Sequence, residues 1–310
     1  MDKINPIFVI KQMLENNSFN REQLLDILES FKDDIPVVPI LLLKDQKVLR
    51  TRSNEDDFFG FVHELSYPPA EFARTDRASL SGAPMFYATA FTKNVDKTHA
   101  YPRIVSALET MPLLRTKEID GVKCMTQSVW YVKSQIHLFA FPFSNKYKRA
   151  CEEIGILNDG WESNVRNHHS KESIEFFTYI GDMMAETNVS CLYDITATCV
   201  DYILTHFSFD GVIYPSVPAE GEGLNICLKP SVVDENIEFA AAATEIIFKN
   251  GDKSRIETLA YAKMLDDNSF EWIITDEGKA WMLDTGFIGK DVCDGTIVVR
   301  SKTLYLQEES

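Results

Sequence analysis

The chain has 310 residues, of which 45% are hydrophobic and 25% are charged, and these proportions exclude a disordered or collagen-like polypeptide. Its 31 basic and 47 acidic residues give a formal net charge of −16 at pH 7. Such a charge repels nucleic-acid phosphates and anionic lipid surfaces. We therefore expect neither nucleic acid nor a membrane among its partners.

The cysteines and the N-terminus indicate a reducing compartment. The six cysteines form no CxxC pair, so we expect reduced thiols rather than a disulfide framework or a zinc site. The N-terminus lacks the apolar core of a secretory signal, and no run reaches the roughly 18 apolar residues of a membrane helix. We expect a cytoplasmic protein. The histidines lack the spacing of a metal site, so we expect no bound metal.

Helical signals dominate the start of the chain. Asn5 precedes a proline, and Asn20 with Gln23 resembles a capping box, so both asparagines are predicted helix caps. Pro36 and a second proline three residues later interrupt the apolar stretch that follows, which no helix can cross. We predict a small N-terminal helical layer over residues 1–44.

Short β-type runs then alternate with helical patterns, which is typical of a mixed α and β protein. Strands are predicted at 85–90, 128–132, 136–141, 211–216 and 225–229, and helices at 102–110, 171–186 and 191–206. The last helix has one apolar face, so we expect it to lie across a sheet. Amphipathic strands with an Asn-Gly turn at 250–251 predict a hairpin. The prediction is an α+β fold with a core over 45–235 and a β-rich extension over 236–310.

Two other features are predicted to be structural. Trp161 and the adjacent histidines at 168 and 169 are expected in a surface loop, and Met183 with Met184 in the core.

The arginines are unevenly placed for so acidic a chain. Four of the eleven lie within 28 residues: Arg50, Arg52, Arg74 and Arg77. One guanidinium group can donate two hydrogen bonds to the oxygens of one phosphate, so the cluster favours an anion site. Ion pairing of these arginines with nearby acidic residues is the simpler alternative. The chain has no GxGxxG, no GxxxxGK[ST] and no GxSxG motif, which leaves out the common nucleotide-binding and serine-hydrolase signatures.

Several separated segments together resemble the RES domain family, which is named for an Arg, a Glu and a Ser. The segments are VLRTR, HELSYPP, TDRASLSGAPMFYATA, SALET, SVWYVKSQIHLFAF and DYILTHFSFDGVIYPSVPAEGEGLNICL, all within residues 45–235. The resemblance implies a fold similar to that of ADP-ribosyltransferases. It also implies an enzyme that consumes NAD by releasing nicotinamide, as do toxins of toxin–antitoxin pairs.

The resemblance also implies which residues form the site. The implied catalytic residues are Arg50, Glu109 and Ser216, and the implied NAD-binding residues are Arg52, Arg77, Tyr87 and Asn225. The chain departs from the family pattern beside its second arginine, where Asp76 replaces a glycine and Ser79 replaces an asparagine. Glu118 is the alternative to Glu109 as the catalytic carboxylate.

The partners that the resemblance implies are NAD as substrate and a cognate antitoxin protein, with no resident cofactor. Phosphorolysis, with inorganic phosphate as co-substrate, and hydrolysis both stay open. Two further alternatives stay open as well: a protein ADP-ribosyltransferase, and a degenerate member that binds NAD or a partner without catalysis.

Overall fold

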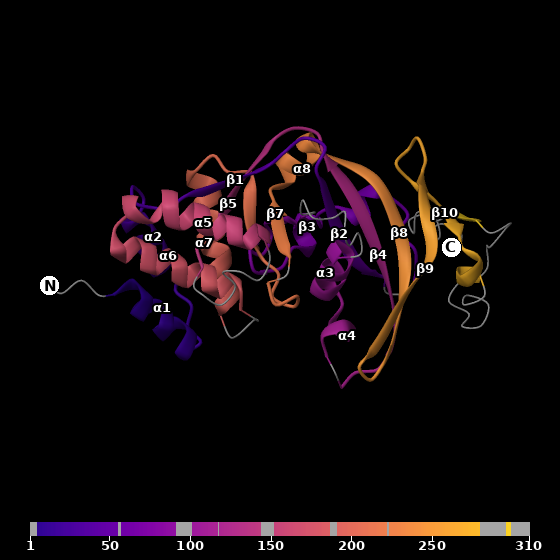
Figure 1. The fold of residues 1–310 in the computed structure, drawn as a ribbon, viewed down its shortest axis with the longest axis horizontal. Helices are drawn as coiled ribbons and strands as arrows, with labels where there is room; N and C mark the ends of the chain where they lie inside the picture. The colour runs from indigo at the N-terminus through magenta and orange to yellow at the C-terminus, as the bar shows by residue number, and fades with distance from the viewer. Residues whose placement is uncertain are drawn as a thin grey trace, which may run out of the picture.

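The computed structural model describes residues 5–54, 57–90, 101–116, 118–143, 152–186, 191–221, 223–279 and 296–298. In these ranges the protein is an α+β structure in which helices flank one long mixed sheet, as Figure 1 shows. This confirms the predicted α+β class with flanking helices. The strands lie in the order β1-β5-β6-β7-β3-β2-β4-β8-β9-β10-β11, and β5 pairs with β6 in parallel while the other described neighbours are antiparallel.

The strands of the sheet are β1 (Val38–Leu42), β2 (Lys47–Asn54), β3 (Phe86–Ala90), β4 (Gly121–Val132), β5 (Ile136–Ala140), β6 (Gly211–Pro215), β7 (Leu224–Leu228), β8 (Ile237–Asn250), β9 (Lys253–Met264), β10 (Phe270–Ile274) and β11 (Thr296–Val298). The α-helices are α1 (Pro6–Glu15), α2 (Arg21–Ser30), α3 (Tyr101–Thr110), α4 (Pro112–Arg115), α5 (Glu152–Asn164), α6 (Lys171–Met184), α7 (Leu192–His206) and α8 (Pro230–Asn236). Short 3-10 helices are η1 (Val62–Leu65), η2 (Ala70–Phe72) and η4 (Arg166–His168).

The predicted elements correspond closely to these. The side-chain oxygen of Asn5 accepts from the Ile7 amide at 2.9 Å, and that of Asn20 accepts from the Gln23 amide at 3.0 Å, which confirms both helix caps. The predicted helices are α3, α6 and α7, and the predicted strands are β3 to β7. β4 begins seven residues earlier than predicted, at Gly121. The hairpin is confirmed, because β8 and β9 pair antiparallel from Ala243 with Tyr261 up to the turn, where Asn250 pairs with Lys253.

The sheet takes strands from all three predicted segments of the chain. β1 pairs with β5, so the N-terminal segment adds a strand as well as helices. β8 pairs along the whole of β4, from Gly121 to Val132, and so joins the C-terminal segment to the centre of the sheet. One continuous sheet therefore supports every wall of the site described below.

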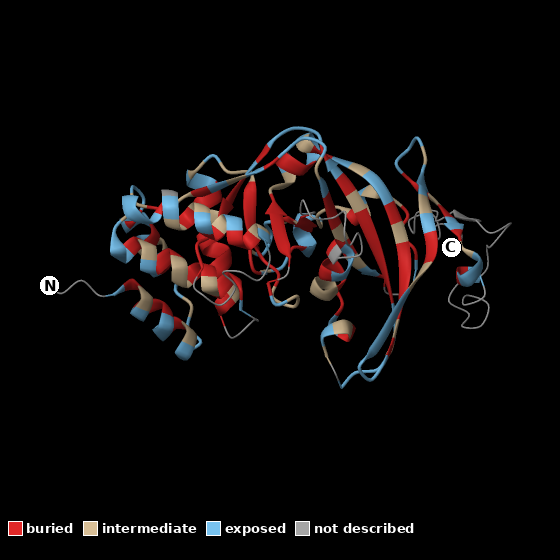
Figure 2. Ribbon diagram, viewed as in Figure 1, coloured by how far each residue is buried: buried red, intermediate tan, exposed pale blue. Residues whose placement is uncertain are grey.

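Helices α5, α6 and α7 group with the N-terminal helices at one end of the molecule (Figure 1). Figure 2 shows the central strands largely buried. Ile195, Cys199 and Ile203 of α7 have no exposed area and pack with apolar residues of β6 and β7, as the predicted apolar face requires. The pair Met183 and Met184 is buried at the end of α6, as predicted.

The prediction of a surface loop around Trp161 is wrong. Trp161 belongs to α5, is only 5% exposed, and belongs to the same apolar cluster as Val38 of β1 and Ala140 of β5. The packing partners come from strands far away in the sequence, so local polarity could not indicate this burial.

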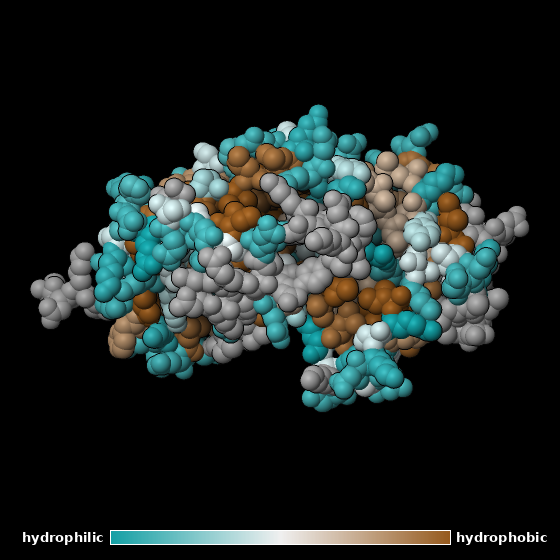
Figure 3. All heavy atoms as spheres, viewed as in Figure 1, coloured by the Kyte–Doolittle hydropathy of each residue, from teal (hydrophilic) through white to brown (hydrophobic). Residues whose placement is uncertain are grey.

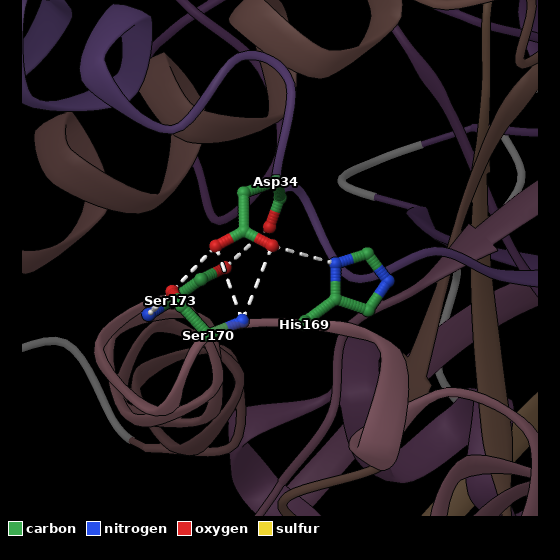
Figure 4. Close-up of polar contacts among 4 residues, drawn as sticks. All are labelled: Asp34, His169, Ser170 and Ser173. Carbon is green, nitrogen blue, oxygen red and sulfur yellow. Dashed lines mark hydrogen bonds and ion pairs between the residues drawn. The ribbon is translucent and has the colours of Figure 1, made fainter.

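The neighbouring histidine segment is also tied to the fold, as Figure 4 shows. The Asp34 carboxylate accepts from the Ser170 amide and hydroxyl, and it contacts Nδ1 of His169 at 3.0 Å. Ser170 is the N-cap of α6, where an anion is favoured by the helix dipole. Burial opposes ionisation, but the bonds from Ser170 and His169 outweigh it and lower the pKa of Asp34. Asp34 therefore fastens the N-terminal layer to α6.

In the view of Figure 3 hydrophobic side chains gather in two places, one near β1 and β5 and one near α3 and α4 as Figure 1 labels them. Within the described ranges no helix has the length and apolar character to cross a membrane. Cys124, Cys191, Cys199 and Cys227 are buried and form no disulfide among the described residues, while Cys151 and Cys293 lie outside those residues.

Candidate functional site

A cavity of about 710 Å³ lies beside the centre of the sheet. Its walls come from β2, β3, β6 and β7 and from helices α3, α4 and α7. The sequence-predicted residues that line it are Arg50, Arg52, Arg77, Tyr87, Glu109 and Asn225. Ser216 is fully buried and contacts Glu109 instead. The structure thus brings all seven predicted residues to one place.

The cavity forms where two neighbouring strands separate. β2 and β3 pair only at Val48 with Ala90 and at Leu49 with Thr89. Beyond Leu49, β2 continues to pair with β4 alone. Nη1 of Arg50 donates to the Tyr87 carbonyl of β3 at 2.6 Å, so this arginine bridges the two strands where the sheet opens.

The Glu109 carboxylate is held at the end of α3 by two donors. Its Oε1 accepts from the Ser216 hydroxyl at 2.6 Å and from the Asn225 amide nitrogen at 2.5 Å. The Asn225 oxygen in turn accepts from the Thr89 hydroxyl at 3.1 Å. Both bonds use the same carboxylate oxygen, which leaves Oε2 without a hydrogen bond to any described residue. The arrangement orients one oxygen and keeps the other for a ligand.

The absence of a side chain at Gly223 allows α3 to approach the loop that precedes β7. A Cβ built on Gly223 would lie 2.9 Å from both methyl groups of Val105 on α3. The Gly223 carbonyl also accepts from the Ser216 amide at 2.8 Å, which fixes the start of the loop. Glycine at 223 therefore permits the contact that brings Ser216 and Asn225 within reach of Glu109.

Polar contacts fasten α3 to the sheet. The hydroxyls of Thr51 on β2 and Ser106 on α3 lie 2.7 Å apart. Gln127 of β4 donates to the Arg103 carbonyl at 2.8 Å and to Thr51 at 3.1 Å. Arg103 forms an ion pair with Glu245 of β8, whose side chain is only 1% exposed. These five residues are called the α3 clamp below.

Arg77 lines the cavity, but its guanidinium is already bonded. Its Nη1 donates to the carbonyls of Met184 and of Glu186, the latter at 2.7 Å, and so caps the end of α6. The guanidinium also lies 5.2 Å from the ring centre of Tyr193 and 5.8 Å from that of Tyr214. Arg77 therefore has a structural role at the end of α6 and also contributes a positive charge to the cavity wall.

The two arginines of β2 are likewise engaged. Arg52 donates to the Glu64 carbonyl and lies 5.1 Å from the Phe59 ring centre. Burial, with the charge of Arg52 adding to it, lowers the pKa of Arg50 to about 10. Arg50 therefore stays protonated at neutral pH, and its buried Nε has no hydrogen-bond partner among the described residues.

Tyr87 organises the turn that contains Asp76 and Ser79. Its hydroxyl accepts from the Ala78 amide and donates to the Ser79 hydroxyl, each at 3.0 Å. The Asp76 amide donates to the Ser79 carbonyl at 2.9 Å and closes the turn. Burial raises the pKa of Tyr87 well above its usual value, so the hydroxyl is neutral. Ser79 thus has a structural partner in Tyr87.

Sequence reasoning missed several residues of the cavity wall: Thr51, Asp76, Thr89, Arg115, Tyr193 and Tyr214. Strand register could have indicated two of them. Asn225 lies on β7, and its neighbours on the two adjacent strands are Thr89 of β3 and Tyr214 of β6. Glu118, the alternative carboxylate, is exposed and lies outside the described cavity lining. The geometry favours Glu109.

The cavity differs in charge from the rest of the chain. Four arginines and two carboxylates, Asp76 and Glu109, line it, which gives 4 − 2 = +2 in a chain of net charge −16. Among the described residues, no group of three or more His, Cys, Asp or Glu side chains could hold a metal ion. The chain matches no protein-family model, and no curated protein sequence is significantly similar to it.

Proposed function

We propose that this protein degrades NAD by breaking the bond between nicotinamide and ribose, within a fold related to that of ADP-ribosyltransferases. The observation that carries the proposal is the Glu109 carboxylate, held by Ser216 and Asn225 in the wall of a cavity that is otherwise positively charged. The ordered resemblance to the RES family names the same residues. A cavity of about 710 Å³ is within the range of small-molecule sites.

The reaction places few demands on proton transfer. The bond between ribose C1′ and the nicotinamide nitrogen breaks, and its electron pair neutralises the pyridinium, so the leaving group needs no proton. Positive charge develops on the ribose ring, where a fixed carboxylate stabilises it. An oxygen of water or of inorganic phosphate then bonds to C1′, and a water nucleophile loses its proton to solvent.

The other residues take supporting roles in this reaction. Ser216 is buried and acts through Glu109, so it is a positioning residue rather than a contact of the ribose. Asn225 does the same and also lines the cavity. Burial raises the pKa values of Tyr87 and Tyr214 well above their usual value, so both hydroxyls in the cavity wall stay neutral, and that of Tyr87 is bonded to Ala78 and Ser79. The arginines supply the positive field for the pyrophosphate.

The proposal is tested by incubating the purified protein with NAD and measuring free nicotinamide by chromatography. Glu109→Gln should lower turnover by ~10²-fold or more and leave NAD binding nearly intact, because the carboxylate acts on the transition state. Glu118→Gln is the matched control and should keep full activity. No nicotinamide release by the wild type would contradict the proposal.

The acceptor is identified in the same assay. A rate that rises with inorganic phosphate, with a phosphorylated ADP-ribose product, indicates phosphorolysis, and a phosphate-independent rate with free ADP-ribose indicates hydrolysis. Labelled NAD with cell lysate tests transfer of ADP-ribose to a protein. If the protein is a toxin, co-expression of the cognate antitoxin should prevent the loss of cellular NAD.

A further inference from the structure

We infer that Arg115, a residue to which the sequence assigned no role, is the main phosphate-binding group of the cavity and takes the pyrophosphate of a dinucleotide. The identity of the ligand rests on the proposed function, whereas the anion site rests on the geometry of Arg115 itself. This assignment shifts the pyrophosphate contact from Arg77 to the short helix α4.

The four arginines of the cavity are not equivalent. Arg50, Arg52 and Arg77 each donate to main-chain carbonyls of the surrounding structure. Arg115 lines the same cavity, is exposed, and makes no hydrogen bond or ion pair with any described residue. Of the four guanidinium groups, that of Arg115 is the one whose donors are all left unused by the described residues.

The other exposed arginines differ in their pairing: some of them pair with carboxylates, whereas Arg74, which lies outside the cavity lining, makes no ion pair with any described residue. Arg21 pairs with Asp201 at 3.1 Å, and Arg166 pairs with Glu162 at 2.6 Å. In a chain with 16 more acidic than basic residues, carboxylates are plentiful on the surface. Arg115 is distinguished by the combination of two properties: it lines the cavity, and it has no carboxylate partner among the described residues.

The backbone that carries Arg115 is fixed on both sides. Before it, the Leu113 side chain is 7% exposed and packs in an apolar cluster with Met125 and Ile247. After it, the ammonium group of Lys249, which is 8% exposed, donates to the carbonyl of Thr116 and to a second one three residues later. A free guanidinium on an anchored backbone loses little backbone entropy when it binds an anion.

The positive charge of Arg115 affects the pKa of Tyr193, another residue of the cavity wall. Burial raises the pKa of the Tyr193 hydroxyl, and the positive charges of Arg77 and Arg115 oppose that rise. Tyr193 belongs to the first turn of α7, across the cavity from α4. An anion between α4 and α7 would therefore meet the uncommitted guanidinium of Arg115, whereas that of Arg77 is already bonded to carbonyls at the end of α6.

The test uses the full-length protein and calorimetric titration with two probes, inorganic pyrophosphate and ADP-ribose, which has no nicotinamide bond to cleave. Arg115→Ala should weaken binding of both probes about tenfold, since a charge-assisted bond to phosphate is worth at least that factor. Arg166→Ala, which also removes one exposed guanidinium, is the control and should bind both probes as the wild type does. Thermal melting should show all three proteins equally folded, and Arg115→Lys should restore part of the affinity.

Equal binding of pyrophosphate by the Arg115→Ala and Arg166→Ala proteins would overturn the inference, as would no binding by the wild type. If the wild type nevertheless releases nicotinamide, the inference fails and the proposed function stands. If pyrophosphate binding depends on Arg115 while NAD stays intact, the anion site stands and the proposed function fails.

Discussion

Helices α3 and α7 pack on the same sheet by different interactions. α7 presents apolar side chains such as Ile195 and Ile203, which have no exposed area. α3 is fastened by the hydroxyl, amide and ionic contacts of the α3 clamp. Apolar packing accepts residues of similar volume, whereas a polar contact is lost when one partner is removed. The helix that carries Glu109 is therefore the one whose position is specified by individual bonds.

The largest effect is expected from breaking the ion pair of the clamp. Arg103→Met leaves the Glu245 carboxylate buried without its partner and should lower the free energy of unfolding by about 3 kcal/mol. Chemical denaturation measures the loss. The double variant Arg103→Met/Glu245→Leu should recover most of it, because no charge then stays buried. A loss below 1 kcal/mol in the single variant would show that the pair does not hold α3.

The next effect concerns catalysis rather than stability. Ser216→Ala removes one of the two donors to Glu109 and should lower kcat about tenfold with little change in KM, because the carboxylate loses its orientation and the ligand loses no contact. Ser134→Ala, at an exposed position, serves as the control and should leave both constants unchanged. A rise in KM with an unchanged kcat would instead place Ser216 in contact with the substrate.

A substitution in the apolar face of α7 should have a smaller effect than those in the contacts of α3. Ile203→Val removes one methylene from the face of α7 and should cost about 1 kcal/mol in denaturation experiments, with kcat unchanged. If this conservative change reduced kcat as much as Ser216→Ala does, the distinction between the two helices would be lost.

An effect on stability no larger than that of Ile203→Val is expected at the partly exposed polar contact of the N-terminal layer. Asp34→Asn weakens the bonds to Ser170 and His169 and should cost about 1 kcal/mol at neutral pH. The pKa of Asp34 is lowered in the folded protein, so its contribution is present above the ordinary value of 3.8 and is lost as the pH falls through the folded pKa. The two proteins should therefore become equally stable in acid, as unfolding measured between pH 7 and pH 2 would show. A constant difference across that range would contradict this role.

The sequence predicts the elements well because their signals are local. Helix caps such as Asn5 and Asn20, the Asn-Gly turn of the hairpin and the apolar face of α7 all depend on neighbours within a few residues. Resemblance selected Glu109 together with Ser216 and Asn225, which lie more than 100 residues later in the chain, and the structure bonds both of them to Glu109.

What the sequence does not predict depends on contacts between distant segments. Trp161 looked like a loop residue because its partners lie on β1 and β5. Arg115 had no role because only the packing of α4 against β8 brings it to the cavity. Arg77 was predicted to bind NAD, and no local pattern could show that its guanidinium caps α6.

The most direct measurement is a crystal structure of the Glu109→Gln protein with NAD. The substitution keeps the side-chain volume and slows cleavage, so the intact substrate should accumulate in the cavity. The account predicts C1′ of the nicotinamide ribose within about 3.5 Å of the residue 109 side chain, the separation of a near-attack geometry, and the pyrophosphate beside Arg115. NAD bound outside this cavity, or bound within it with C1′ turned away from residue 109, would contradict the account.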